Sequence, residues 1–199
     1  KEARRRELPG TIAARKLDVT DRAAIDELVE AVAEEHSRID IVVNNAGTSM
    51  ARPFEEITDE MWQADLELKL FGAIRMIRLA LPGMKQRGWG RIISITSSGV
   101  EQPIPNLALS NGIRSAVVGW SKTLANEVAD DGITVNVVMP GRIHTQRVDE
   151  LDAAAAKRTD SDVATVAARS RATIPAGRYG KPEEFADVVT FLASARAGY

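Results

Sequence analysis

Short runs of β-branched residues alternate with longer segments of helical periodicity along most of this chain. The strand-like runs cover residues 11–17, 39–43, 91–96 and 133–139. The run at 39–43 is compact and apolar, as expected of a strand that is buried on both faces. Helices are predicted from an N-terminal cap at Thr20, from a cap at Thr58 to residue 81, and over residues 113–129 and 182–193. Pro82 and the glycines that follow it predict a turn, and Gly132 predicts a C-terminal cap.

This alternation predicts the fold class. Strands that alternate with helices form right-handed crossovers, which give an α/β fold with a doubly wound parallel sheet. A length of 199 residues suits one domain, residues 1–199. Ligands of such sheets bind beyond the carboxyl ends of the strands, so functional motifs are expected directly after strands.

Charge and composition exclude several other classes of protein. A net charge of −2 and a pI near 5.8 give no general electrostatic case for binding nucleic acid or an anionic membrane. The sequence has no cysteine, which excludes disulfides and thiol catalysis and fits a cytoplasmic location. No apolar stretch approaches the length of a membrane span. The two histidines, His36 and His144, have no ligand-type neighbours at helical spacing, so no metal site is expected.

Two motifs follow predicted strands. Asn44-Asn45-Ala46-Gly47 comes after the 39–43 strand, and its small residues would let a flat ligand approach the backbone. Pro140-Gly141-Arg142-Ile143-His144-Thr145 follows the 133–139 strand, and Thr145 could cap a helix and bond a carboxamide. Either motif by itself would also fit a simple polar turn.

The order and spacing of five motifs resemble the short-chain dehydrogenase/reductase family, and within it the 3-oxoacyl-acyl-carrier-protein reductase-like branch. The motifs are Asp18-Val19, Asn44 to Gly47, Gly90-Arg91-Ile92-Ile93 leading to Ser97, Val135-Asn136, and Pro140-Gly141. The resemblance implies a Rossmann-type sheet, an NADP or NAD cofactor, and a small carbonyl or alcohol substrate. It also implies a homodimer or homotetramer formed through the two long helices, where Val118 and Trp120 could serve either the interface or the core.

The same resemblance assigns residues to the cofactor. Asp18 and Val19 match positions beside the adenine, and Asn45 matches the position beside the ribose. Gly47 matches the glycine of close approach, and Ile143 and Thr145 match positions around the nicotinamide carboxamide. Ser97 falls where the family places its substrate-orienting serine. The implied cofactor-binding set is completed by Ala46, Thr96, Arg114, Pro140 and Gly141.

The sequence departs from the family at the catalytic Tyr-x-x-x-Lys motif. Ser110 stands at the tyrosine position, thirteen residues beyond Ser97, and Arg114 stands at the lysine position. The chain's two tyrosines, Tyr179 and Tyr199, have no lysine four residues later. In the long helix, Lys69 replaces the family's usual asparagine.

These substitutions change the acid chemistry. A serine hydroxyl is a far weaker acid than a tyrosine phenol, and arginine, with a pKa above about 12, keeps its proton. Arg114 could still fork to ribose hydroxyls. A lysine desolvated at Lys69 would have its pKa shifted toward neutrality. The hypothesis is that Lys69, or a water held by Ser97 and Ser110, replaces the tyrosine as acid; the alternative is that Lys69 only forms an ion pair or holds a water.

Several family features are absent from the sequence. It lacks the glycine-rich phosphate loop and the residue that separates NAD from NADP. The family's sheet has two strands before the 11–17 strand, which would otherwise have no partner for its backbone. We therefore expect the natural chain to extend beyond both ends, and the sheet to be incomplete in the sequence as it stands.

Two further segments bear on substrate and partners. Residues 149–178 correspond to the family's substrate-covering helical segment, which we expect to be a mobile lid. It shows no aromatic cage and no acid-recognition cluster, so the sequence does not predict the substrate. The turn at residues 84–91 carries Lys85, Arg87 and Arg91, which fits docking of an acidic carrier protein or a solvated basic turn.

The leading prediction is an NAD(P)-dependent oxidoreductase that moves hydride between nicotinamide and a carbonyl/alcohol pair, with an atypical proton donor. The alternatives are a catalytically silent Rossmann protein that binds NAD(P) or a metabolite, and a regulatory subunit of an active homologue. Ser110 and Arg114 favour the alternatives, whereas the retained Ser97 and the nicotinamide-side residues favour the enzyme.

Overall fold

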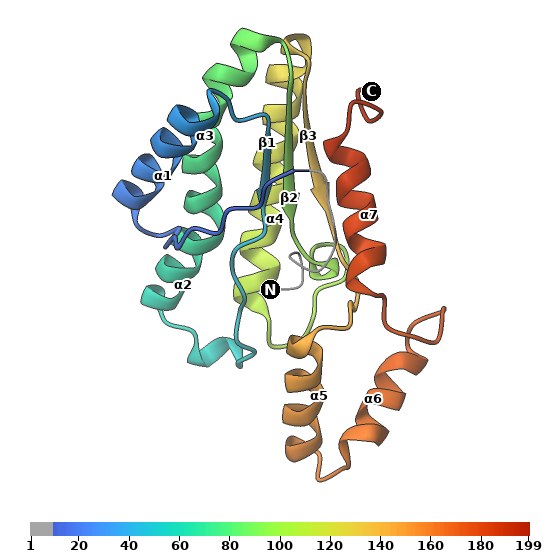
Figure 1. The fold of residues 1–199 in the computed structure, drawn as a ribbon. Coiled ribbons are helices and arrows are strands. Elements are labelled where there is room, and N and C mark those ends of the chain that lie inside the picture. Colours follow the sequence, from blue (N-terminus) through green and yellow to red (C-terminus); the bar gives the residue numbers. More distant parts are fainter. Residues whose placement is uncertain (1–9) are drawn as a thin grey trace.

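The computed structural model of the protein describes residues 10–199, and a three-stranded parallel sheet lies at its centre (Figure 1). The strands β1 (Ile41–Asn44), β2 (Gly90–Ile95) and β3 (Ile133–Val138) pair in the order β1-β2-β3. Ile41 pairs with Arg91 and Gly90 with Ile133, so all three carboxyl ends meet at one edge. The predicted parallel α/β sheet is confirmed.

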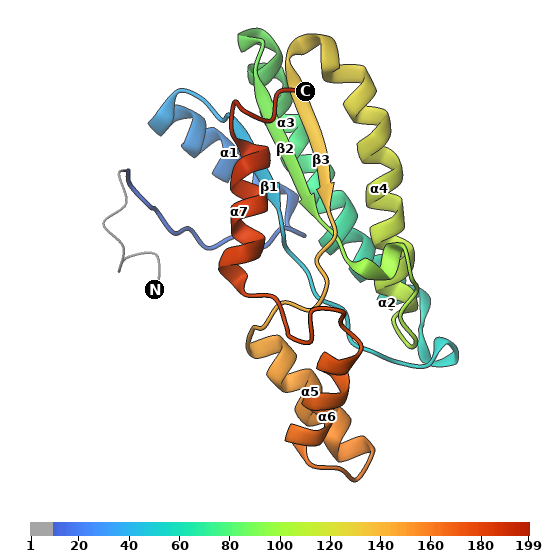
Figure 2. The same ribbon diagram turned by 90° about the vertical axis from the view of Figure 1, so that its right-hand side faces the viewer.

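Helices cover both faces of the sheet, as a doubly wound fold requires. The helices α3 (Gly72–Arg87) and α4 (Ala108–Val128) lie on one face, and α1 (Arg22–His36) packs against α3. The helix α7 (Pro182–Ala193), which has the predicted bounds, covers the other face over β2 (Figure 2).

The core forms around the central strand. Ile92 and Ile93 point to opposite faces of β2 and are both fully buried. In β1, by contrast, Ile41 and Val43 are 42% and 46% exposed. The prediction that this strand is buried on both faces is therefore wrong for one face, because α7 packs over β2 and leaves that side of β1 open. Trp120 is half-buried and packs against the core cluster.

The predicted strand at residues 11–17 is wrong. The segment has no regular secondary structure, although it reaches Leu17 beside β1 and α3. A strand exists only where a neighbour completes its backbone hydrogen bonds, and no strand within residues 10–199 pairs with this segment.

The second long helical stretch begins as predicted and ends later. Thr58 caps α2 (Asp59–Leu66) by accepting a 3.4 Å bond from the Met61 amide. The π-helical turn η3 (Glu67–Phe71) joins α2 to α3, which continues through Pro82 to Arg87. The predicted end at residue 81 is wrong, because Pro82 lies on the exposed side and the fully buried Met84 anchors the last turn.

Two other helix starts differ from the prediction. Asp21, and not Thr20, caps α1 by accepting from the Ala24 amide. Helix α4 begins at Ala108, five residues before the predicted start, because Leu109 is buried although no polar side chain caps the helix. Gly132 adopts the left-handed conformation expected of a C-terminal cap, with φ of 69°.

Two helices, α5 (Gln146–Arg158) and α6 (Val163–Ala172), lie beyond the carboxyl ends of the strands (Figure 1). The segment is attached at its base by a bridge between Ile143 and Gly180, with backbone hydrogen bonds of 2.8 and 2.9 Å. Across residues 10–199, no helix combines the length and apolarity needed to cross a bilayer.

Candidate active site

The loops that follow the three strands are joined at the carboxyl edge of the sheet. The Thr96 amide donates to the Val138 carbonyl over 2.9 Å, and the Ser98 amide donates to the Pro140 carbonyl over 3.2 Å. These bonds extend the pairing of β2 and β3 into the loops. The predicted motifs after all three strands therefore meet at one edge.

Arg114 ties the β1 loop to the end of β2. One terminal nitrogen donates to the carbonyls of Ile95 (2.8 Å) and Thr96 (3.0 Å), and the other donates to the carbonyl of Gly47 (3.0 Å). Nε is buried without a partner among the described residues. Burial lowers the pKa of the guanidinium, and the charge of Asp65 opposes that shift. Both terminal nitrogens thus bond to main chain, and the second N–H of the nitrogen that bonds Gly47 is left for the predicted contact with ribose hydroxyls.

Lys69 lies in the π-helical turn, an irregularity that is frequent at functional sites. Its side chain is only 2% exposed, and Nζ donates to the Ser49 hydroxyl over 2.7 Å and forms an ion pair with Asp65. Burial lowers the pKa of Lys69; the hydrogen bond and charge of Asp65 oppose this, and the charge of Arg114 adds to it. Lys69 is therefore desolvated, which the hypothesis of an acid requires, and it also forms the ion pair that the alternative describes.

Gly47 separates Lys69 from Arg114. Its φ of +106° lies in the region that favours glycine, and an added Cβ would lie 2.8 Å from Cγ of Lys69. The glycine is therefore required by the packing of Lys69 against the β1 loop.

The two serines of the candidate site have different surroundings. Ser97 lies two residues after the end of β2, is half-buried, and accepts from the Gly99 amide over 3.1 Å. Ser110 is buried in the first turn of α4, and its hydroxyl makes no hydrogen bond within residues 10–199. No base is therefore in place among these residues to activate Ser110.

Asp18 and Val19 lie beside the start of α3. The exposed Asp18 carboxylate accepts from the amide and hydroxyl of Thr20, at 2.9 and 2.7 Å, and these bonds lower its pKa, the amide bond most. An added Cβ on Gly72 would lie 2.8 Å from the Val19 carbonyl, so the two segments are in close contact.

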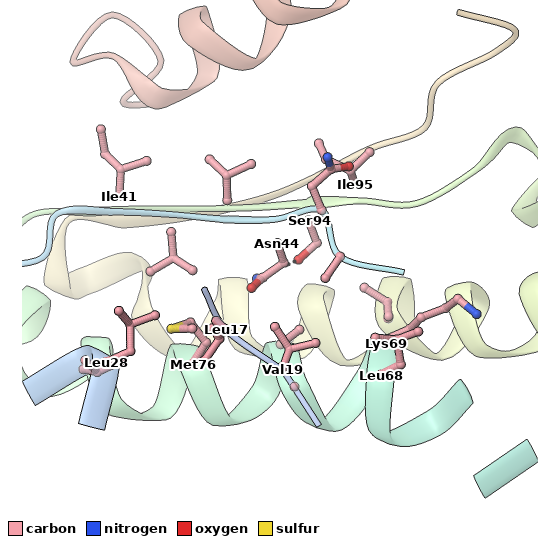
Figure 3. Close-up of a pocket in the computed structure, with 18 of the residues that line it drawn as sticks. Leu17, Val19, Leu28, Ile41, Asn44, Leu68, Lys69, Met76, Ser94 and Ile95 are labelled. Atoms are coloured by element: carbon pink, nitrogen blue, oxygen red, sulfur yellow. Dashed lines mark hydrogen bonds between the residues drawn. The ribbon is translucent and has the colours of Figure 1, made fainter. Parts of the chain in front are cut away.

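A cavity of about 370 Å³ lies between β1 and the helices α1 and α3 (Figure 3). Most of its lining is apolar, and it brings together five of the predicted site residues: Val19, Asn45, Ala46, Lys69 and Arg114. Asn44 donates to Ser94 over 3.4 Å at the same end. Ser97, Ser110 and the 140–145 segment are not part of this lining.

The segment after β3 is held in a different way. Gly141 is exposed, and an added Cβ there would meet no atom within 4 Å. Ile143 is fixed by its bridge to Gly180. Thr145 occupies the N-cap position of α5, but its side chain makes no capping hydrogen bond, so its hydroxyl is not used by the helix.

Sequence reasoning missed Asp65 and Ser49. Asp65 lies four residues before Lys69, a spacing at which opposite charges meet on a helix, so this signal was available. Ser49 also donates to Asp65 over 3.0 Å, but it lies in a loop and nothing in the sequence marks it.

Several known proteins are similar to this chain in sequence and in fold. A family model described as enoyl-(acyl carrier protein) reductase matches residues 2–199. A Streptomyces virginiae protein, named as a ketoacyl reductase of the monensin polyketide synthase, is 40% identical over 91% of this chain and 70% of its own length. The 3-oxoacyl-[acyl-carrier-protein] reductase of Thermotoga maritima is 35% identical over 96% of this chain and 74% of its own.

Among solved structures, L-sorbose reductase of Gluconobacter frateurii, complexed with NADPH and L-sorbose, superposes with a TM-score of 0.86. It is 36% identical over 92% of this chain and 70% of its own. The fold, the motif order and these matches agree. The chain belongs to the short-chain dehydrogenase/reductase family.

Proposed function

We propose that this protein is an NADP(H)-dependent reductase that interconverts a carbonyl and an alcohol, with a substrate related to 3-oxoacyl thioesters. The proposal is supported by relatives named as 3-oxoacyl-[acyl-carrier-protein] reductases and by structural neighbours that are NADPH-dependent or complexed with NADPH. NAD is the alternative cofactor. When bound, the nicotinamide supplies the hydride to the carbonyl carbon.

The residues at the carboxyl edge fit a dinucleotide. Gly141 presents open backbone, Asn45 and Thr145 are exposed, and Asp18 is held rigid by Thr20. Asp18 and Val19 would hold the adenine end, Asn45 to Gly47 the ribose, and Ile143 and Thr145 the carboxamide. Pro140 and Thr96 would lie along the edge of the sheet between the ribose and the carboxamide.

Lys69 supplies the proton that the carbonyl oxygen must gain. The observation that carries this role is a buried ammonium whose pKa is lowered by burial, beside a cavity that also reaches Asn45. A general acid works best when its pKa lies near the working pH. The Ser49 hydroxyl is hydrogen-bonded to both Lys69 Nζ and Asp65. A new proton can reach Lys69 through this hydroxyl after Lys69 has given its own to the substrate. Ser97 orients the substrate oxygen, and Ser110 holds a water.

Arg114 fixes the geometry and does not transfer a proton. Its three carbonyl contacts hold the Gly47 turn against β2, so Lys69 and Ser97 keep their relative positions. Its positive charge also favours the neutral form of Lys69.

A catalytically silent NADP(H)-binding protein is the second candidate. Two observations favour it: both terminal nitrogens of Arg114 bond to main chain, and Ser110 has no base among the described residues. In that case Lys69 and Asp65 would form a structural ion pair only.

Two substitutions at Lys69 distinguish these candidates in the full chain. Lys69→Arg keeps the charge and the Asp65 pair but cannot release a proton, and Lys69→Met removes both. We expect both to lower ketone reduction at least about a hundredfold while NADPH affinity, measured by fluorescence, stays within about threefold of wild type. Lys122→Met, on the exposed side of α4, is the matched control. Full activity of Lys69→Arg would contradict the role as acid.

The assembly proposed for this family member is a homodimer or homotetramer in the cytoplasm. Leu79 on α3 is 39% exposed and Val118 on α4 is half-buried, so both long helices offer apolar surface to a second copy. Light scattering after size exclusion tests this directly: a monomer at micromolar concentration would contradict it.

A further inference from the structure

A second cavity, of about 320 Å³, lies between α5, α6 and the segment that leads into α7. Its polar and charged lining residues are His144, Asp149, Asp152, Arg171, Tyr179 and Lys181. They come from three separate parts of the sequence and are brought together by the bridge between Ile143 and Gly180. The fold therefore assembles a charged site that the sequence of the lid segment does not show.

Both carboxylates of this cavity already have partners. Asp149 lies 3.0 Å from the His144 ring nitrogen. Asp152, whose side chain is 6% exposed, accepts from the Tyr179 hydroxyl over 2.7 Å and lies 3.5 Å from the guanidinium of Arg142. Asp152 is thus paired with a cation and a hydroxyl donor, and Asp149 faces the His144 ring.

The two cations of the cavity, Arg171 and Lys181, have different surroundings from the carboxylates. The Arg171 guanidinium lies over the Tyr179 ring, 5.8 Å from its centroid, and makes no ion pair within residues 10–199. Lys181 also makes no ion pair there; its charge acts on Glu184, which Arg178 already holds through two hydrogen bonds of 2.6 and 2.7 Å. Arg171 and Lys181 therefore line the cavity with their charges outside any ion pair among residues 10–199.

The position of the cavity links it to the candidate active site. His144 belongs to the segment after β3, between Ile143 and Thr145, and α5 and α6 lie beyond the same strand ends as Ser97 (Figure 1). The cavity therefore lies beyond the carboxyl ends of the strands, where ligands of such sheets bind.

We propose that this cavity binds an oxyanion, a carboxylate or phosphate, carried by the carbonyl substrate, with Arg171 as the principal contact and Lys181 as the second. The substrate class is then an anionic ketone or aldehyde. This inference rests on the proposed reductase function. The planar fork of arginine matches two oxygens of such a group, and Arg171 also makes a cation–π contact with the Tyr179 ring.

The test compares two ketones that differ only in charge, 4-oxopentanoate and 4-oxopentanamide. Their affinities for the full chain are measured by ligand-observed NMR with NADP⁺ present, so that no reduction occurs. We expect wild type to bind the anion about tenfold more tightly than the amide, the effect of one charged hydrogen bond. Arg171→Gln removes the preference, Lys181→Gln reduces it, and Arg171→Lys retains part of it. Arg169→Gln, on the exposed side of α6, leaves it unchanged.

Equal affinities in wild type, or a preference that survives both Arg171→Gln and Lys181→Gln, would overturn the inference. Competition by acetate and by inorganic phosphate shows which oxyanion is favoured. Reduction of both ketones with NADPH is measured separately. An Arg171-dependent preference without reduction would contradict the reductase function alone, and reduction without any preference would contradict the oxyanion site alone.

Discussion

Replacing Gly47 with alanine tests the packing that joins Lys69, the β1 loop and Arg114. An alanine at φ of +106° pays for a backbone conformation that L residues rarely adopt, which costs about 1–3 kcal/mol. Its Cβ would also lie 2.8 Å from Cγ of the buried Lys69, and forcing such a contact costs about 1–3 kcal/mol. We expect Gly47→Ala to lower the free energy of unfolding by about 2–6 kcal/mol in total.

Urea denaturation of the full chain, followed by circular dichroism, measures this loss. Gly119→Ala is the matched control, because Gly119 lies inside α4 with no atom within 4 Å of an added Cβ. That substitution should raise the free energy of unfolding by about 0.5–1 kcal/mol, since alanine favours the helix. In the double variant Gly47→Ala/Lys69→Ala, the steric part of the loss should disappear and the backbone part should remain. A Gly47→Ala chain within about 0.5 kcal/mol of wild type would refute the reasoning.

Three further predictions concern charge and hydrogen bonding. Burial lowers the pKa of Lys69, and ketone reduction needs the protonated form of this side chain. The rate of reduction should therefore be highest below the pKa of Lys69 and fall as pH rises through it, at a pH below the range usual for lysine. A flat pH–rate profile up to the ordinary lysine range would contradict this. Tyr179→Phe leaves a buried oxygen of Asp152 without its donor, so unfolding should become easier by about 1–3 kcal/mol in a urea titration, whereas no change would show that water replaces the hydroxyl. Arg114→Met removes three hydrogen bonds between the Gly47 turn and β2, and amide hydrogen exchange at residues 45–49 should rise at least about tenfold while exchange in α7 stays constant.

Sequence periodicity predicted the sheet well because the strand signals are local. Each of the three strands is a β-branched run, and Gly132 and Thr58 mark helix ends through their own backbone or side-chain chemistry. The solvent exposure of Ile41 and Val43 in β1 could not be predicted, because it depends on where α7 packs on the sheet. Pro82 misled the prediction because a proline on the exposed side of a helix is outweighed by the burial of Met84 two residues later.

The candidate site was predictable in part. Motif spacing singled out Lys69, Ser110 and Arg114 as candidates, and the structure brings Lys69 and Arg114 to one cavity. The three carbonyl contacts of Arg114 depend on the path of two loops, which no spacing rule describes. The charged cavity between α5 and α6 could not be predicted from the sequence either. Arg171 and Lys181 come close to His144 only through the bridge between Ile143 and Gly180.

We propose that this family member performs redox chemistry with Ser110 and Arg114 at the positions that the sequence resemblance gives to the family's tyrosine and lysine. The most direct test is to titrate NADPH into the full chain by fluorescence and then follow nicotinamide absorbance after adding a panel of ketones and 3-oxoacyl thioesters. We expect saturable binding and substrate-dependent oxidation of NADPH that Lys69→Arg abolishes. Saturable binding with no oxidation on any substrate would contradict it and would establish a silent nucleotide-binding protein instead.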